Sequence, residues 1–581
     1  MPDAAMTGGI NGTWARLIVE ELVRLGVDTF CLASGFRSAP LAIAAAQHPR
    51  ARVISHYDER GTAFFALGFA RATGRAAVWI TTSGTAVANG LPAVVEADAD
   101  YVPMVLLTAD RPPELRRTGA NQTIDQAGIF ARYVRWSCDM PAPDEAVPPA
   151  YVLTTVDQAC CKAHSAPQGP VHLNCMFRAP LARKTAVSAT YLAPVQLWEA
   201  SAHPFTQYVP LRGASDAEHI AAQLAGASRI LMVVGRLSNN RDGTAALDLA
   251  KACRWPVFAD VNSQVRLGPQ PEVLIDAYDL CLENTTFADA HAPEAVLYLG
   301  APAVSKNLMR LLARHRPDPF VVVHDAPDRL DPTHQVTGRM QQSVQAACRS
   351  LQAAMGTAAG FDETWLKAWQ KANRYARKVL EEELTGPGTL SEPFVAMAVT
   401  RRIADGHGLV LGNSLPVRDA DRFGSAGWCR VHVAANRGAS GIDGTIATAA
   451  GAACGWDTPV TVLLGDLSLL HDVNSLAMAR SYPLTVVVIN NNGGGIFHHV
   501  DIDTSPGTFE RCFGTPHGLQ FAHAAALFGH RYAQVYSRKE FLEVYSGACT
   551  GGESVIIEVC TDRKENHALR LALAGGMTQT G

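Results

Sequence analysis

Short apolar runs alternate along the chain with segments in which apolar residues recur at helical spacing. The apolar runs lie at residues 29–33, 76–82, 102–108, 230–234, 256–259, 295–299, 320–324, 460–464 and 484–489. The helical spacing is found at residues 13–25, 62–72 and 363–384. Strands that alternate with helices are typical of a mostly parallel sheet, so the pattern predicts an α/β fold.

The alternation is interrupted twice, and the interruptions predict three domains. Residues 184–212 form a Pro- and Thr-containing stretch without clear periodicity, and the polar helical segment 363–384 precedes the last alternating region. A chain of 581 residues is also too long for a single core. We therefore expect domains at residues 1–185, 186–375 and 376–581, each containing a mostly parallel sheet.

The middle domain resembles a nucleotide-binding fold in its pattern. Its first strand, 230–234, is followed by Gly235-Arg236-Leu237-Ser238, which lacks the G-x-G-x-x-G sequence that brings a helix N-terminus against a pyrophosphate. We therefore expect this domain to be largely structural and to bind neither FAD nor NAD.

Two strands of the last domain end in side chains that carry oxygen ligands. Asp466 follows one apolar run, and an asparagine triplet at residues 490–492 follows the next. Ligands of parallel sheets bind beyond the carboxyl ends of the strands, and Mg²⁺ prefers a few protein oxygens together with phosphate and water. Because Gly465 and the glycines at 493–495 allow close backbone approach, the pattern predicts a site for a Mg²⁺-diphosphate. Spacing alone does not show which of the three asparagines would be the cation ligand.

The composition of the chain limits which kinds of binding partner are expected. The chain is 48% hydrophobic and 18% charged, with a net charge of −4, which gives no electrostatic reason to expect a nucleic-acid partner. No apolar run is long enough to span a bilayer, so membrane insertion is not expected. The 13 cysteines contain no C-x-x-C pair and are expected to be free thiols. The N-terminus lacks a signal-peptide pattern, and we expect a cytoplasmic location.

Glu59 is the candidate for the chemical step. It lies in a charged turn between a short strand at 52–55 and the helical segment 62–72. Charged residues at such a turn often only cap the helix. Beside a Mg²⁺-diphosphate, however, a partly dehydrated carboxyl suits thiamine diphosphate, because it can share a proton with a nitrogen of the pyrimidine ring.

Several longer motifs carry a resemblance that spans the whole chain. They are DERG at 58–61, TSGTAVAN at 82–89, TADRPPEL at 108–115, GANQ at 119–122, GPVHLN at 169–174, GNS at 412–414, NRGASGIDG at 436–444, GDLS at 465–468 and NNNGG at 490–494. In these motifs the chain resembles the 2-succinyl-5-enolpyruvyl-6-hydroxy-3-cyclohexene-1-carboxylate synthases, thiamine-diphosphate enzymes of menaquinone biosynthesis. Leu467 stands where the wider superfamily usually has glycine, which narrows the resemblance to this family.

The resemblance implies a three-domain thiamine-enzyme fold with pyrimidine-binding, central and diphosphate-binding domains. Asp466 and Asn491 would bind Mg²⁺ or Mn²⁺ through their side chains and Gly493 through its carbonyl, with Asn490 and Asn492 as competing ligands. Glu59 would activate the cofactor. The remaining cofactor-binding positions would be Ser440, Gly441, Ile442, Gly465, Ser468 and Asn491. Ile442 would hold the bent cofactor. The structural alternatives are that Ile442 is a core residue and that Ser440 is a helix cap.

The implied substrates are 2-oxoglutarate and isochorismate, which together carry four carboxylates. Guanidinium groups bind carboxylates in a bidentate fork. The positions that match the family's substrate-binding residues are Arg37, Arg111, Asn121, Gln122, Lys306, Ser414, Arg418 and Arg437. The loop that usually reads Pro-Gly-Ser-Arg-Ser in the family is Ser34-Gly35-Phe36-Arg37-Ser38 here, and the departure that matters is Phe36 in place of serine. We expect Phe36 to point outward; an altered acceptor pocket is the alternative.

The reaction implied is decarboxylation of 2-oxoglutarate followed by 1,4-addition of the succinyl semialdehyde carbanion to isochorismate. The resemblance also implies a homodimer or homotetramer with active sites between subunits. One alternative is a related thiamine-diphosphate 2-oxoacid decarboxylase or carboligase with a different acceptor. The others are a non-catalytic paralogue, disfavoured by Glu59, Asp466 and Asn491, and a flavin-dependent oxidase, disfavoured by the missing dinucleotide motif.

Overall fold

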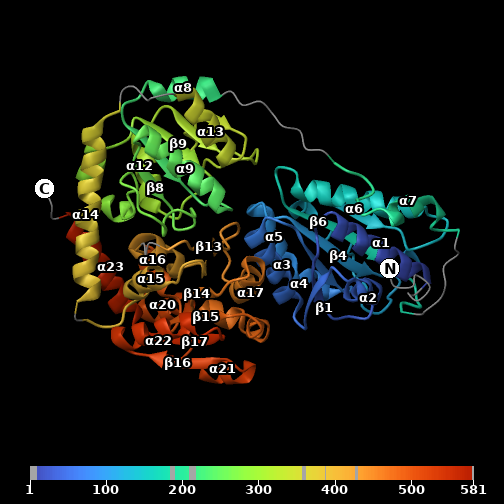
Figure 1. The fold of residues 1–581 in the computed structure, drawn as a ribbon. Coiled ribbons are helices and arrows are strands. Elements are labelled where there is room, and N and C mark those ends of the chain that lie inside the picture. Colours follow the sequence, from blue (N-terminus) through green and yellow to red (C-terminus); the bar gives the residue numbers. More distant parts are fainter. Residues whose placement is uncertain are drawn as a thin grey trace. The chain divides into compact units, whose positions relative to one another are not determined.

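A computed structural model shows three parallel sheets with helices between their strands (Figure 1). It describes residues 9–182, 190–208, 217–355, 361–386, 388–425 and 429–578. The chain divides into two compact units: the first contains Met1–Arg212, Asn436–Asp457 and Asn474–Ala479, and the second contains the rest. The three sheets confirm the α/β expectation.

The first unit contains a six-stranded parallel sheet of order β2-β1-β3-β4-β6-β5. Its strands are β1 Thr29–Ala33, β2 Arg52–His56, β3 Ala77–Thr81, β4 Met104–Asp110, β5 Trp136–Met140 and β6 Pro170–Met176. Its α-helices are α1 Gly9–Arg24, α2 Ala39–Gln47, α3 Glu59–Thr73, α4 Thr85–Asn89, α5 Leu91–Ala99, α6 Pro149–His164, α7 Gln196–Ala200, α17 Thr445–Trp456 and α19 Leu476–Ala479, with 3-10 turns at Pro113–Leu115, Ala131–Tyr133 and Ala193–Val195. The central strands β3 and β4 are buried throughout, as expected for a sheet covered on both faces.

The second unit contains two parallel sheets, of orders β11-β10-β9-β7-β8 and β13-β12-β14-β15-β17-β16. The strands are β7 Ile230–Val234, β8 Val257–Ala259, β9 Ala295–Leu299, β10 Phe320–Val323, β11 Gly338–Met340, β12 Gly408–Leu411, β13 His432–Ala435, β14 Val460–Gly465, β15 Leu484–Asn490, β16 Arg531–Val535 and β17 Val555–Cys560. The middle-sheet helices are α8 Ala217–Ala225, α9 Asn240–Cys253, α10 Tyr278–Cys281, α11 Thr285–Ala290, α12 Lys306–His315 and α13 Val344–Met355. The later helices are α14 Glu363–Thr385, α15 Glu392–Arg402, α16 Leu415–Phe423, α18 Asp466–His471, α20 Pro506–Phe509, α21 Ala522–Phe528, α22 Arg538–Thr550 and α23 Arg563–Thr578, with a 3-10 turn at Gly495–His499 and a π turn at Glu510–Gly514. A 3-10 turn at Val473–Ser475 has its first residue in this unit and its other two in the first unit.

One hydrophobic core joins the two sheets of the second unit. The long helix α14 contributes Trp365, Trp369 and Leu380 to a cluster that also contains Phe258 of the middle sheet and Leu463 of the last sheet. Trp369 meets Phe258 edge to face, with ring centroids 4.9 Å apart. Such aromatic contacts add to the stabilisation that area burial provides, so α14 ties both sheets into one unit.

Helices α3 and α17 of the first unit pack with their backbones in direct contact. A Cβ added at Gly68 would lie 2.1 Å from the carbonyl oxygen of Thr448, and one added at Gly451 would lie 2.1 Å from that of Phe65. Only glycine permits this approach. Residues some 380 positions apart are therefore joined in one compact unit.

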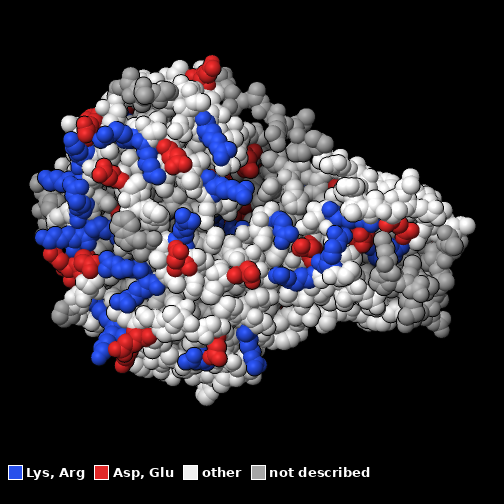
Figure 2. All heavy atoms as spheres, in the orientation of Figure 1, with Lys and Arg blue, Asp and Glu red and all other residues white. Residues whose placement is uncertain are grey.

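The connections between the expected domains are partly described. The first expected boundary, at residue 185, lies outside the described residues, and the second, at 375, falls within α14. Within the stretch expected to be irregular, Tyr191, Val195 and Trp198 are buried in the first core. Among the described residues no helix is long and apolar enough to cross a membrane. On the face shown in Figure 2, basic and acidic side chains are both present.

Candidate active site

Glu59 begins α3, at the carboxyl end of the edge strand β2. The sequence placed it in a turn before residue 62, but the helix starts three residues earlier. The side chain of Asp58 caps the helix by accepting N–H bonds from Arg60 at 3.0 Å and Gly61 at 3.3 Å. Asn89 donates to Glu59 Oε2 at 3.2 Å. Asp58 therefore performs the capping role, which leaves the half-buried Glu59 carboxyl for other chemistry.

Two arginines expected to bind substrate lie at the same edge of the first sheet. Arg37 follows β1 and donates to the carbonyl of Phe177 at 2.8 Å, while its buried Nε has no acceptor among the described residues. Arg111 follows β4 and contacts the Ser83 hydroxyl. Burial, together with the nearby charge of Arg111, lowers the pKa of Arg37, and burial lowers the pKa of Arg111. A bound carboxylate would relieve this desolvation and like-charge repulsion.

Neutral donors extend this edge. Gln122 adopts a positive φ of 56°, and its amide donates to the carbonyl of Ser83 at 2.8 Å. Gly84 lies against it, since a Cβ there would be 2.9 Å from Gln122 Cγ. Asn121 is exposed. Phe36 is also exposed, with a relative accessibility of 75%, which agrees with the outward orientation expected for it.

A buried polar network that sequence reasoning missed supports the loop of Arg111. Asp110 accepts from the Arg111 backbone N–H at 2.7 Å and from Asn174 at 3.0 Å. Asn174 Oδ1 accepts from Thr108 at 3.0 Å and from Gln126 at 2.7 Å. These partners come from β4, from β6 and from the loop between β4 and β5. The sequence therefore offers no periodic signal for the network, although satisfied networks of this kind make a site rigid.

Asp466 lies at the carboxyl end of β14, on the last sheet. Only 2% of it is exposed. Its Oδ1 accepts from the backbone of Leu467 at 2.7 Å, and its Oδ2 accepts from Gly493 N–H at 2.9 Å and lies 3.0 Å from His517 Nε2. Burial raises the pKa of Asp466, and the contact with His517 opposes that shift. His517 was not anticipated, because it lies 51 residues further along the chain in an irregular segment.

The three asparagines after β15 differ in how their amide oxygens are used. Asn490 Oδ1 accepts from the Asn492 backbone at 3.2 Å, and Asn492 Oδ1 accepts from the N–H groups of His517 and Gly518 at 2.9 and 2.8 Å. Asn491 Oδ1 is buried and has no donor among the described residues. A buried amide oxygen without a donor is costly, so the chemistry of this position suits a bound cation.

The glycines beside Asn491 are required by the fold. Gly493 has a φ of 124°, and a Cβ there would lie 2.0 Å from the carbonyl oxygen of Gly514. A Cβ at Gly494 would lie 2.2 Å from the carbonyl oxygen of Phe513. Together with Asp466 and Asn491, this backbone forms an oxygen-rich edge that fits a hard divalent cation.

Ser414, Gly465 and Ser468 are further predicted positions at this sheet edge, whereas Lys306 lies elsewhere in the unit. Ser414, with a φ of 71°, precedes α16, and its carbonyl accepts from the half-buried Arg418. Burial lowers the pKa of Arg418. Gly465 ends β14, and Ser468 is buried on α18. Lys306 is exposed at the first position of α12, in the middle sheet's part of the unit.

The loop after β13 belongs to the first unit. Glu96 of α5 accepts from the backbone N–H groups of Gly438 and Ala439 at 2.9 and 2.6 Å, and Arg71 pairs with it at 3.1 Å. This buried carboxylate fixes the loop that carries the predicted residues Arg437, Ser440, Gly441 and Ile442. Ser440 has a positive φ of 60°.

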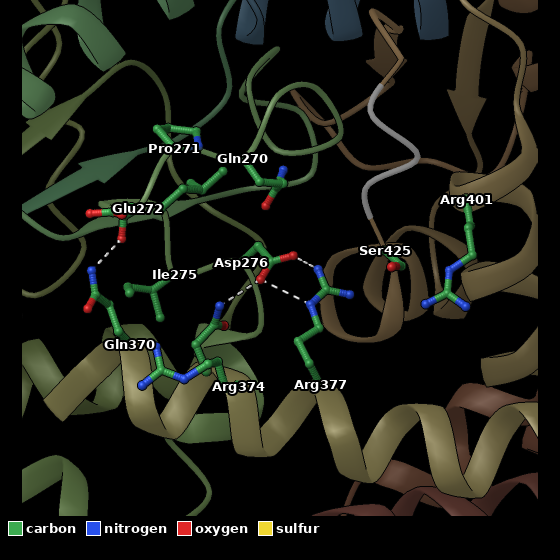
Figure 3. A pocket seen from close by; sticks show the side chains of 12 residues that line it. Gln270, Pro271, Glu272, Ile275, Asp276, Gln370, Arg374, Arg377, Arg401 and Ser425 are labelled. Atoms are coloured by element: carbon green, nitrogen blue, oxygen red, sulfur yellow. Dashed lines mark hydrogen bonds and ion pairs between the residues drawn. The ribbon is translucent and has the colours of Figure 1, made fainter. Parts of the chain in front are cut away.

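A polar cavity of about 690 Å³ lies elsewhere, between the middle-sheet loops and helices α14 and α15 (Figure 3). Its lining includes Asp276, Arg374, Arg377 and Arg401. Asp276 is ion-paired with Arg377 and accepts from Asn373 at 2.9 Å. None of the residues predicted for the site lines this cavity, so we place the candidate site at the sheet edges instead.

Family descriptions match all three parts of the chain. "Thiamine pyrophosphate enzyme, N-terminal TPP binding domain" matches residues 12–129, "Middle domain of thiamine pyrophosphate" matches 189–411, and "Thiamine pyrophosphate enzyme, C-terminal TPP binding domain" matches 428–559. The sequence-based expectation of a thiamine-diphosphate protein is confirmed.

Full-length relatives identify the family within this group. Proteins named 2-succinyl-5-enolpyruvyl-6-hydroxy-3-cyclohexene-1-carboxylate synthase are similar to the chain in Rubrobacter xylanophilus (51% identity, 97% of this chain and 98% of the relative), Salinibacter ruber (46%, 95% and 94%) and Chloroflexus aurantiacus (40%, 95% and 94%). The chain belongs to the 2-succinyl-5-enolpyruvyl-6-hydroxy-3-cyclohexene-1-carboxylate synthase family of thiamine-pyrophosphate enzymes.

Proposed function

We propose that the chain decarboxylates 2-oxoglutarate and adds the resulting four-carbon unit to isochorismate. The products would be 2-succinyl-5-enolpyruvyl-6-hydroxy-3-cyclohexene-1-carboxylate and CO₂, as part of menaquinone biosynthesis. Bound thiamine diphosphate supplies the electron sink for this chemistry. The observation that carries the proposal is the full-length identity of 51% to a synthase of that name, and the cytoplasm is the expected location.

The diphosphate would be held through Mg²⁺ or Mn²⁺ by Asp466, Asn491 and the carbonyl of Gly493. The support for Asn491 is its buried, donor-free Oδ1, because the oxygens of its two neighbours already accept backbone hydrogen bonds. Gly465 and Ser468 beside Asp466, and the loop positions Ser440, Gly441 and Ile442, are the further cofactor-binding positions in this proposal.

Glu59 would hold a proton shared with the cofactor's pyrimidine nitrogen. Its carboxyl is not used for helix capping, since Asp58 has that role. Changing Glu59 to Gln should lower turnover by at least about 100-fold, the usual range for loss of a proton-transfer group. Mn²⁺-dependent binding of thiamine diphosphate should persist in this variant. Full activity of Glu59→Gln would refute the assignment.

The carboxylates of both substrates would be bound by the cationic positions. Arg37 and Arg111 lie together at one sheet edge, and Arg418 lies at another with Ser414. Arg437 and Lys306 complete the cations, and Asn121, Gln122 and Ser414 are the neutral donors. The partly desolvated guanidinium groups support this role, since a carboxylate would compensate their burial.

Turnover with and without isochorismate tests the reaction. The purified chain is incubated with thiamine diphosphate, Mg²⁺ and 2-oxoglutarate, and CO₂ release and adduct formation are followed. We expect both to require isochorismate. Steady consumption of 2-oxoglutarate without isochorismate would instead indicate a decarboxylase, and adduct formation only with another acceptor would indicate a related carboligase.

We further propose a homodimer or homotetramer in which Glu59 of one subunit serves the diphosphate site of another. Glu59→Gln and Asp466→Ala chains carrying different tags can be coexpressed and the mixed oligomer purified. A mixed dimer would contain one intact site, so about a quarter to a half of wild-type activity should return. If each site is built from a single chain, the mixed oligomer should remain inactive.

A further inference from the structure

We propose that Glu392 is a positioning residue that fixes the amide of Asn491 with its oxygen toward the bound cation. This inference rests on the proposed role of Asn491 as a cation ligand. Asn491 Nδ2 donates to Glu392 Oε1 at 2.8 Å, while Asn491 Oδ1 has no donor among the described residues. A carboxylate accepts hydrogen bonds only. It therefore holds the NH₂ group on its own side and turns the oxygen to the other.

Glu392 is itself held in a single orientation. Its Oε2 accepts from Arg570 Nη2 at 2.6 Å, and its backbone N–H donates to Asn566 Oδ1 at 2.8 Å. Both Glu392, at 3% exposure, and Arg570, at 6%, are buried. The contacts connect α15 and α23 to the end of β15, so the orientation of one amide is determined by two distant helices.

Asp419 completes the network but does not contact Asn491 in any described hydrogen bond. It accepts from Arg570 Nε at 3.0 Å and also pairs with Arg570 Nη2. The two carboxylates raise the pKa of Arg570, which remains charged. Of these two carboxylates, Glu392 is the one that contacts the Asn491 amide in the described hydrogen bonds, and its negative charge favours a cation on the far side of that amide. Residues behind a metal ligand commonly tune its affinity in this way.

The competing interpretation is that the buried ion cluster only stabilises the fold. Breaking such a cluster destabilises a protein whichever carboxylate is removed. A positioning role, by contrast, distinguishes Glu392 from Asp419. In Glu392→Gln, the new amide oxygen is attracted to Arg570 and its NH₂ group faces Asn491. The Asn491 amide should then turn over and present NH₂ to the cation.

Mn²⁺ binding, followed by electron paramagnetic resonance with thiamine diphosphate present, provides a readout other than activity. We expect Glu392→Gln to weaken Mn²⁺ binding by about 10- to 100-fold, as is usual for groups behind a metal ligand. The matched control is Asp419→Asn, which removes the other carboxylate bound to Arg570 and should change Mn²⁺ affinity less than about three-fold. Thermal unfolding of both variants measures the structural contribution separately.

A double variant tests the orientation directly. In the double variant Glu392→Gln with Asn491→Asp, the side chain at 491 is a carboxylate. One of its oxygens can accept from the NH₂ group of the glutamine at 392, and the other can face the cation. Mn²⁺ affinity should recover relative to Glu392→Gln, although the total charge equals that of the wild type. Equal losses in Glu392→Gln and Asp419→Asn, or no recovery in the double variant, would overturn the positioning role. If Asp466→Ala leaves Mn²⁺ binding intact, the proposed cation site itself fails.

Discussion

We expect a buried carboxyl pair in the first unit to make residues 198–206, which include the end of α7, sensitive to pH. Glu21 and Asp157 have no exposed surface. Glu21 accepts from Trp198 Nε1 and from the Phe205 backbone, and Asp157 accepts from the Thr206 backbone at 2.9 Å. Burial, followed by the hydrogen bond to Asp157, raises the pKa of Glu21 to about 8. The pair therefore carries a proton at neutral pH and holds residues 198–206 against α1 and α6.

The direction of the pH effect follows from the raised pKa. In the closed state residues 198–206 contact the carboxyl pair, and in the open state they do not. Below pH 4.5, the ordinary pKa of a glutamate such as Glu21, the proton is bound in both states. Between that value and pH 8, opening releases the proton, so the local stability falls as the pH rises. One proton corresponds to at most about 1.4 kcal/mol per pH unit. From pH 6 to 7.5 the loss is therefore at most about 2 kcal/mol, and we expect about 1 kcal/mol after solvent screening.

Hydrogen exchange of the Phe205 and Thr206 amides measures this opening. After correction for the intrinsic pH dependence of exchange, opening at pH 7.5 should be about 5- to 30-fold more frequent than at pH 6. Glu21→Gln should remove this dependence. Glu20→Gln is the matched control, because hydrogen bonds from His48 and Arg24 lower the pKa of Glu20 to about 2, and it has no proton to release in this range. An unchanged pH dependence in Glu21→Gln would refute the reasoning.

Three further predictions concern other parts of the chain. Gly68→Ala should destabilise the first unit by about 1–3 kcal/mol through overpacking, seen as a lower thermal midpoint, whereas Gly547→Ala, with no atom within 4 Å of its Cβ, should not. Phe36→Ser should change the free energy of unfolding by no more than about 0.5 kcal/mol and should leave KM for isochorismate unchanged, because Phe36 is exposed. A shifted KM would show that this side chain shapes the acceptor site. Glu96→Gln should speed hydrogen exchange of the two loop amides that Glu96 accepts from, and unchanged protection would contradict its anchoring role.

Much of the fold follows from local sequence patterns. The strands expected at 29–33, 230–234 and 295–299 have those same bounds in the structure, because a fully buried parallel strand is a continuous apolar run. Short strands such as β13, and strands with mixed exposure such as β16, were not identified. Their sequences lack both the continuous apolar run and the clean alternation that distinguish strands.

The parts of the candidate site in which contacts join distant segments of the chain could not be predicted from the sequence. Asp466 and the asparagine triplet follow recognisable strands, so their shared edge was predictable. The difference between Asn491 and its neighbours depends on which donors occupy each amide oxygen. The residues that contact them are distant in sequence: Glu392 lies 99 residues before Asn491, and His517 lies 25 residues after Asn492. Contacts of this kind have no period along the chain.

The pairing of α3 with α17 has a consequence for synthesis of the chain. About 370 residues separate the end of α3 from the start of α17, and at roughly 5–20 residues per second their translation takes tens of seconds. During that time Phe64, Phe65 and Gly68 of α3 are without the helix that covers them. The first unit is the first to be translated but among the last to be completed. We therefore expect its apolar helix face to be a binding site for chaperones on the nascent chain.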